Sequence, residues 1–263
     1  MANMLLVCLN ASAQTAEDYF KKGVNKSFFQ DYTGAIPDYT KAIELKPDYA
    51  LAYQKRGNAK EGLKDLKGAM ADYSKAIEYD PKDADAYYSR GCVKSRLDDK
   101  PGAIADFTKT VELKPEYGKA FSNRGNAKFR SGDFKGAVED FSKVLALDPK
   151  RADVYASRAN AKGILQDFKG AIADCNKSIE LKPNNANAYF NRAVAKKGLN
   201  EFQGAIADYT KAIEFDPTKP DVYYNRGIAK VDAGQKQGAC TDFKKAEELG
   251  SPEAMEAVKQ YCK

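Results

Sequence analysis

The chain has 263 residues, and its 43 Lys and Arg residues against 37 Asp and Glu residues give a net charge of +6. It contains no His, which excludes Ser-His-Asp and Cys-His catalysis and metal sites built on imidazole. A charge excess this small does not indicate nucleic-acid binding without a basic patch. No apolar run approaches the roughly 18 residues that a membrane-spanning helix needs.

Residues 1–13 differ from the rest of the chain because they carry no charged side chain. Residues 4–9 are apolar, and Ala11, Ser12 and Ala13 form the small-x-small pattern typical of a signal-peptidase site. We therefore predict a signal peptide and export to the periplasm or the exterior, although no Lys or Arg precedes the apolar run. The alternative is a frayed terminus or a first packing turn, and the protein would then be cytoplasmic.

The remaining sequence repeats with a period of 34 residues, which is clearest in six prolines. These are Pro47, Pro81, Pro115, Pro149, Pro183 and Pro217. When this proline is given position 32, seven repeats start at residues 16, 50, 84, 118, 152, 186 and 220. Every repeat has an aromatic residue at position 4, Gly or Ala at position 8, and Ala at position 20.

The spacing of these positions predicts two helices in each repeat. Positions 4, 8 and 11 lie on one face of a first helix, and positions 20, 24 and 27 lie on one face of a second. Gly at position 19 marks the start of the second helix, and the proline at position 32 ends it. Small residues at positions 8 and 20 would let the two helices approach closely.

This pattern resembles the tetratricopeptide repeat family, and the resemblance covers residues 16–251. It implies an all-α fold, a right-handed α-solenoid (superhelix) of seven helix-turn-helix repeats whose first helices line a concave groove. Residues 252–263 are predicted to form a C-terminal capping helix, with Ser251 as its N-cap and Pro252 in its first turn. The Tyr that the family usually has at position 11 is Lys in all seven repeats.

Charged residues also recur at fixed positions. Position 7 is Arg in the second to seventh repeats, and position 23 is Asp in all seven. We predict ion pairs between these Arg and Asp residues, which would join the two helices of a repeat. The alternative is an Arg stripe that binds anions. The Lys at position 11 is expected to place its ammonium group near the acid at position 16, such as Asp65, Asp133 or Asp167.

Four cysteines follow residue 13, and they predict one disulfide. Cys240 lies near the start of the last second helix and Cys262 at the end of the capping helix, so two antiparallel helices would bring them side by side. Cys92 and Cys175 lie more than two repeats apart and are expected to remain thiols. The sequence lacks the Cys and His spacing of a zinc site, so neither a metal nor a cofactor is expected.

In the family, positions 2, 5, 6, 9, 12 and 13 of the first helix face the groove. Their charges in this chain are evenly mixed in sign, which argues against nucleic acid as a partner. Aromatic rings and amides recur at these positions, and Asn can both donate to and accept from a peptide backbone. The predicted partner-binding residues are Tyr88, Asn123, Asn126, Phe129, Arg130, Asn160, Phe190, Asn191, Tyr224 and Asn225. The alternative is that the rings only stiffen the groove and the amides are simply solvated.

These patterns favour a non-catalytic scaffold that binds an extended peptide or protein segment. An enzyme is not expected, because the sequence shows no nucleophile with a base and no Gly-rich phosphate loop. The alternatives are an accessory subunit or assembly factor of a secreted or cell-envelope enzyme complex and, with less support, nucleic-acid or anion binding through the Arg and Lys rows.

A heat-shock chaperone C-terminus is not an expected partner. Members of the family that dock chaperones hold a C-terminal carboxylate in a clamp of Lys, Arg and Asn side chains. Only Asn58 and Lys119 match parts of that clamp, whereas Gln54, Ser89 and Asn123 do not.

Overall fold

The computed structural model describes residues 14–262, so the predicted signal peptide lies outside the described residues. The described chain consists of fifteen α-helices, seven successive antiparallel pairs and one further helix, and contains no strand, which confirms the all-α prediction. Between residues 14 and 262, no helix is both long enough and apolar enough to cross a membrane. The helices group into two compact units, one ending at Pro115 and the other starting at Glu116.

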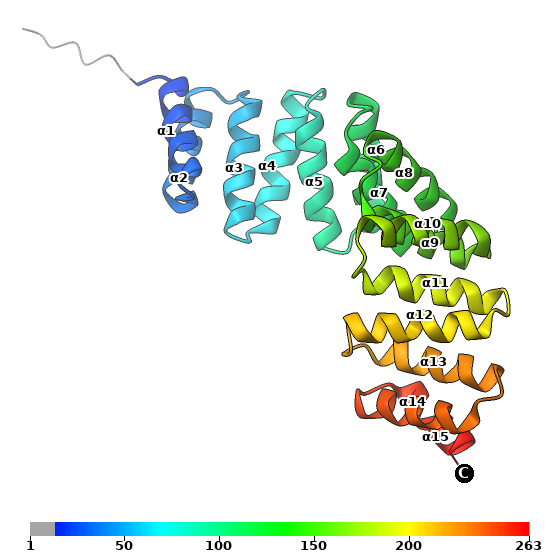
Figure 1. The fold of residues 1–263 in the computed structure, drawn as a ribbon. Helices are drawn as coiled ribbons and strands as arrows, with labels where there is room; N and C mark the ends of the chain where they lie inside the picture. The colour runs from blue at the N-terminus through cyan, green and yellow to red at the C-terminus, as the bar shows by residue number, and fades with distance from the viewer. Residues whose placement is uncertain (1–13, 263) are drawn as a thin grey trace, which may run out of the picture. The chain divides into compact units, whose positions relative to one another are not determined.

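The first unit contains three helix pairs. They are α1 (Ala16–Phe28) with α2 (Tyr32–Leu45), α3 (Ala50–Gly62) with α4 (Leu66–Tyr79), and α5 (Ala84–Arg96) with α6 (Lys100–Leu113). Each helix packs against the next one along the chain, and α3 also contacts α1 and α5 (Figure 1). The first helices of successive repeats therefore lie next to one another.

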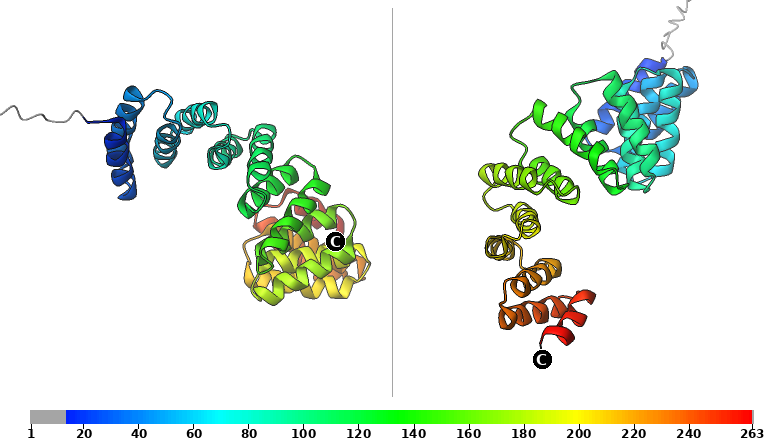
Figure 2. Two further views of the ribbon diagram at one scale, coloured as in Figure 1. Left: turned by 90° about the horizontal axis from the view of Figure 1, so that it is seen from above. Right: turned by 90° about the vertical axis from the view of Figure 1, so that its right-hand side faces the viewer.

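The second unit contains four helix pairs and one further helix. They are α7 (Gly118–Arg130) with α8 (Phe134–Leu147), α9 (Ala152–Ile164) with α10 (Phe168–Leu181), α11 (Ala186–Gly198) with α12 (Phe202–Phe215), α13 (Pro220–Asp232) with α14 (Lys236–Glu248), and finally α15 (Pro252–Tyr261). Because α11 contacts both α9 and α13, three first helices form one continuous surface within this unit. The right-hand view of Figure 2 shows the same stacking order of α9 to α15 from another side.

The turn inside each of the first five repeats explains why Gly is needed at position 19. In the first five repeats the Asp at position 16 caps the second helix, and Asp65 accepts a hydrogen bond from the Gly68 N–H at 2.9 Å. A Cβ atom on Gly68 would collide with the Asp65 carboxylate. The residue before the cap has a positive φ in all seven repeats, yet only Gly132 and Gly234 are glycines there.

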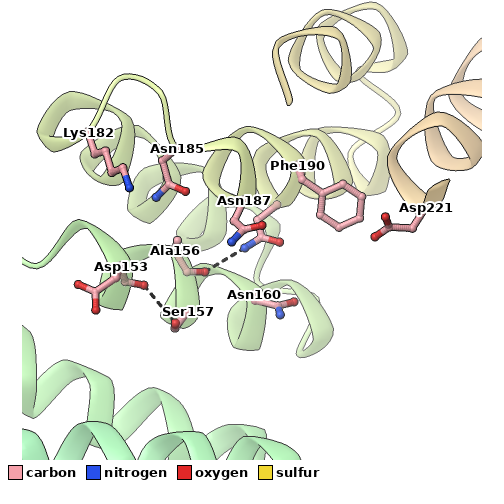
Figure 3. A pocket seen from close by; sticks show the side chains of 10 residues that line it. Asp153, Ala156, Ser157, Asn160, Lys182, Asn185, Asn187, Phe190 and Asp221 are labelled. Carbon is pink, nitrogen blue, oxygen red and sulfur yellow. Dashed lines mark hydrogen bonds between the residues drawn. The ribbon is translucent and has the colours of Figure 1, made fainter. Parts of the chain in front are cut away.

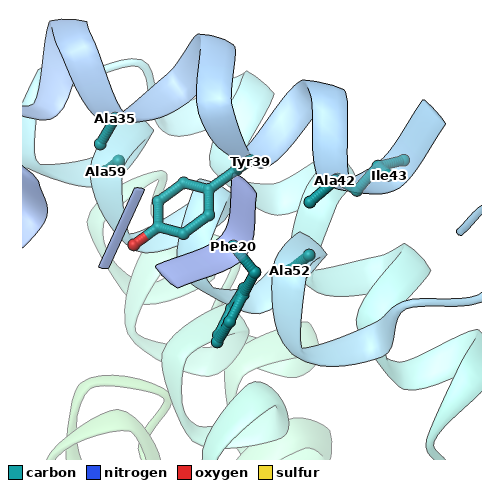
Figure 4. Packing of buried hydrophobic residues seen from close by; sticks show 7 residues of the cluster. All are labelled: Phe20, Ala35, Tyr39, Ala42, Ile43, Ala52 and Ala59. Carbon is teal, nitrogen blue, oxygen red and sulfur yellow. The ribbon is translucent and has the colours of Figure 1, made fainter. Parts of the chain in front are cut away.

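A large side chain at position 24 fills the space between the two helices of most repeats. In the first repeat, Tyr39 lies beside Phe20, with the small residues Ala35 and Ala59 close by (Figure 4). The ring packs over Gly23, where an added Cβ would lie 2.7 Å from the nearest ring atom. The small residue at position 8 therefore makes room for the ring at position 24, as the spacing predicted.

The predicted ion pairs are present in the second to seventh repeats. Arg158 donates two hydrogen bonds to the buried Asp174, at 2.8 and 2.6 Å, and the other five repeats show the same geometry. The prediction for the Lys row is wrong, because Lys162 Nζ lies 2.8 Å from the same Asp174. The buried carboxylate offers further acceptor positions, whereas Asp167, the expected partner, caps α10 by accepting from the Gly170 N–H.

The last helix covers the end of the second unit. α15 packs against α14 and buries Ala254 and Ala257, and Ser251 caps it by accepting from the Ala254 N–H. The structure contains the disulfide expected between Cys240 and Cys262, whose Cα atoms lie 5.3 Å apart. α15 is therefore held to α14 by both packing and a covalent bond.

Candidate partner-binding groove

An open cavity of about 520 Å³ lies on the surface formed by α9, α11 and the start of α13. It is lined by Asp153, Ala156, Ser157, Asn160, Lys182, Asn185, Asn187, Phe190, Asn191 and Asp221 (Figure 3). Three of these, Asn160, Phe190 and Asn191, are among the residues predicted to bind a partner. The structure thus brings together part of the predicted site, from two successive repeats.

Phe190 is the apolar wall of this cavity. Its half-buried ring packs on the fully buried ring of Tyr209, with 5.7 Å between the ring centroids. Phe190 also lines two adjoining cavities, one toward Ile164 and Val194 and one toward Val222. The hollow is therefore elongated across the three first helices, and Phe190 lies where its parts meet.

Asn191 joins two neighbouring first helices. Its Nδ2 donates a hydrogen bond of 3.0 Å to the backbone oxygen of Ala156 on α9. A primary amide has two N–H donors and an acceptor oxygen, so this bond uses only one of the hydrogen-bonding positions of Asn191. Asn160 is exposed on α9 and lines the same hollow.

Tyr224 and Asn225 line a further cavity between α13 and the capping helix. The Tyr224 ring packs against Phe243, with 5.9 Å between the centroids. Asn225 donates from Nδ2 to the backbone oxygen of Asp221, one turn earlier in its own helix, at 2.8 Å. Part of the hydrogen-bonding capacity that the sequence suggested for a partner is therefore used inside α13.

Four predicted residues on α7 lie outside the cavity around Phe190. They are Asn123, Asn126, Phe129 and Arg130. The Phe129 ring packs edge-on against Phe134 of α8, with 5.2 Å between the centroids. Phe129 thus has a packing role within its own repeat. Tyr88, the tenth predicted residue, belongs to α5 of the first unit, where its ring packs against Phe107.

Sequence reasoning missed several residues that line the cavity. Lys182 and Asn185 lie in the turn between α10 and α11, outside the first-helix positions at which the binding residues were predicted. Asp153, Asn187 and Asp221 all occupy position 2 of their repeats, a position that the family resemblance already places in the groove. They were nevertheless left out of the predicted partner-binding residues, although polar residues recur at position 2 in three successive repeats.

The Arg row is engaged within the protein. Besides its two bonds to Asp208, Arg192 donates a third hydrogen bond to Asn176 of the preceding repeat at 2.7 Å. Arg226 likewise bonds Asp242 and, at 3.0 Å, Thr210 of the preceding repeat. These guanidinium groups link repeats, which argues against a stripe that binds anions. In the described part of the chain, no group of three or more His, Cys, Asp or Glu side chains could hold a metal ion.

Sequence models of one repeat family match most of the chain. Of two models described as "Tetratricopeptide repeat", one matches residues 118–151 and the other matches residues 84–117 and 152–185. A model described as "TPR repeat" matches residues 30–64, 63–98 and 196–234. No curated protein matches the sequence.

Several solved structures share this arrangement of helices. A tetratricopeptide repeat protein from Parabacteroides merdae is 21% identical over 95% of this chain and 100% of its own, with a TM-score of 0.65. YrrB, described as a TPR protein with an unusual peptide-binding site, is 24% identical over 68% of this chain and 92% of its own, with a TM-score of 0.64. The C-terminal part of a TPR repeat-containing protein from Cytophaga hutchinsonii is 18% identical over 91% of this chain and 99% of its own, with a TM-score of 0.71. At these identities the likeness concerns the fold.

Proposed function

The chain belongs to the tetratricopeptide repeat family, and we propose that it is a non-catalytic scaffold that binds an extended peptide or protein segment in the hollow around Phe190. One observation carries this proposal. A partly exposed aromatic ring stands at the centre of an elongated hollow that also contains amide side chains from two successive first helices.

The two kinds of side chain suit the two parts of a bound chain. Phe190 is held in place by Tyr209 beneath it, so it offers a rigid apolar surface for a partner's side chain, and such aromatic anchors often dominate the energy of an interface. Asn160 and Asn191 offer donors and acceptors that suit a peptide backbone. YrrB, which shares the fold, is described as having a peptide-binding site, and this supports a peptide as the class of ligand.

The test begins with a ligand selected on the full chain from a displayed library of random peptides. We expect Phe190→Ala to weaken binding of the selected peptide by about tenfold, roughly the loss of one modest anchor. Phe129→Ala is the matched control. It also removes a phenyl ring from a first helix, but Phe129 lies in the fourth repeat, outside the hollow. Its effect on binding should be small.

Thermal unfolding of each variant separates binding from stability. If Phe190→Ala lowers the unfolding midpoint strongly while the affinity per folded molecule is unchanged, then the ring is structural and the proposal fails. The proposal also fails if the two Phe variants weaken binding equally.

The disulfide favours a setting outside the reducing cytoplasm for this scaffold. Cys240 and Cys262 are bonded, and structural disulfides persist mainly in oxidising compartments. This supports the export that the pattern of residues 1–13 suggests, and a secreted or cell-envelope protein would find its partners there.

A further inference from the structure

The charges around the Phe190 hollow are balanced at one end and unbalanced at the other. Asp153 accepts two hydrogen bonds from Arg151, at 2.9 and 2.7 Å, and these bonds lower the pKa of the Asp153 carboxyl. Asp221 is an exposed residue in the first turn of α13, and none of the ion pairs among residues 14–262 involves it. Asp221 therefore brings a negative charge to the hollow that no ion pair balances.

This carboxylate stands beside the aromatic wall. In Figure 3 the Phe190 ring points toward Asp221, and both residues line two of the same cavities. Tyr209, on which Phe190 packs, has a pKa raised first by burial and then by the negative charge of Asp221. The carboxylate and the Phe190 ring thus form one face of the hollow, and the Tyr209 ring is buried beneath it.

Two lysines lie near this face. Lys182 lines the hollow at the end away from Asp221 (Figure 3). Lys219 lines one of the cavities that Phe190 and Asp221 share, together with a second carboxylate, Asp216, whose pKa is lowered by hydrogen bonds from Thr218 and by the charge of Lys219. A ligand that crosses the hollow would therefore meet a positive charge at Lys182 and a negative charge at Asp221.

We propose that the Phe190–Asp221 end of the groove selects a lysine or arginine side chain in the bound segment. This inference rests on the proposed peptide-binding function. The methylene stem of such a side chain would lie against the Phe190 ring, and its cation would pair with the Asp221 carboxylate. An exposed ion pair and a cation–π contact are each weak, but together they correspond to a preference of about tenfold over a neutral side chain.

The experiment uses the full chain and a peptide selected on it from the random library. Each position of this peptide is replaced in turn by Lys, Ala and Glu, and the affinities are measured. We expect one position at which Lys binds most tightly and Glu least tightly. Asp221→Asn, which keeps the size of the side chain, should remove this preference, and Asp221→Lys should reverse it so that the Glu peptide binds best.

Asp232→Lys is the matched control for the charge reversal. Asp232 is an exposed residue at the other end of α13 and lines none of the cavities described above, yet the variant changes the net charge by the same amount. It should leave the preference for Lys intact. A general attraction between charged peptide and protein would respond equally to both reversals.

Two results would overturn the inference. If no position of the peptide prefers Lys, or if the preference survives Asp221→Asn, then Asp221 does not select a basic side chain. The peptide-binding proposal would still stand in that case, provided that Phe190→Ala weakens binding. If no peptide binds the hollow at all, both the proposed function and this inference are wrong.

Discussion

A single buried carboxylate organises each repeat from the second to the seventh. It accepts two hydrogen bonds from the Arg at position 7 and pairs with the Lys at position 11, so each buried carboxylate has two cationic partners. The first repeat has Lys22 in place of the Arg. There Asp38 pairs with Lys26 alone, at 2.6 Å, and its side chain is 14% exposed against 6% for Asp174. The missing guanidinium explains why this carboxylate is less enclosed.

Removing one of these arginines should destabilise the protein more than removing an arginine from an exposed pair. Arg158→Ala leaves the buried Asp174 with Lys162 as its only cation, and we expect a loss of about 2–3 kcal/mol in the free energy of unfolding. Arg151→Ala is the matched control, because Arg151 makes the same two-bond contact with the exposed Asp153. It should cost about 0–1 kcal/mol, since solvent screens an exposed pair.

Urea denaturation of the two variants measures this difference directly. Equal losses would show that burial of the Asp does not increase its dependence on Arg, and the stabilising role assigned to the Arg row would then be wrong. Because Arg151 is the N-cap residue of α9 and Arg158 lies within α9, both changes are made at the same helix.

At the scale of a helix, the cap at position 16 distinguishes the repeats from one another. The Asp of the first five repeats caps the second helix, whereas Glu201 and Gln235 of the last two make no such bond. Yet Gly204 and Gly238 still stand at position 19, where the cap requires Gly. The sixth and seventh repeats therefore retain the space for a capping Asp although they lack the residue.

Glu201→Asp should therefore stabilise the protein. The shorter carboxylate can accept from the Gly204 N–H, as Asp167 accepts from Gly170 at 3.0 Å, and we expect a gain of about 1 kcal/mol in the free energy of unfolding. The reverse change, Asp167→Glu, should lose a similar amount. Both values come from urea denaturation. If Glu201→Asp changes nothing while Asp167→Glu is destabilising, the sixth repeat has a turn geometry that the cap cannot use.

Much of this arrangement could be predicted from the sequence, because the 34-residue period shows which residues share a face of a helix. It led to the helix pairs, the small residues under the position 24 rings, the Arg–Asp pairs and the disulfide. The site was only partly predictable. Periodicity does not show that the turn residue Lys182 lines the hollow. It also does not show that Asn225 donates a hydrogen bond to the backbone of its own helix. Nor could it show that the Lys at position 11 pairs with the same buried Asp as the Arg, instead of with the capping Asp at position 16.

At the scale of the molecule, contacts are local within each unit. Each helix packs against its neighbours in the chain, and some first helices also touch each other, as α3 touches α1 and α5 and as α11 touches α9 and α13. Stability is then approximately a sum of contributions from each repeat and from each interface between neighbours. Removing a whole repeat in register should therefore leave the remaining repeats able to stack.

Deletion of residues 118–151 tests both the local nature of the fold and the place of the site. It removes α7 and α8 but keeps every residue that lines the Phe190 hollow, so we expect an unchanged helical signal per residue and retained binding of the selected peptide. Deletion of residues 186–219 is the matched control, because it removes the same number of residues together with Phe190. That protein should also be helical but should not bind the peptide. Loss of the helical signal in both deletions would contradict the repeat-by-repeat account of stability. Retained binding after the second deletion would place the peptide elsewhere on the chain.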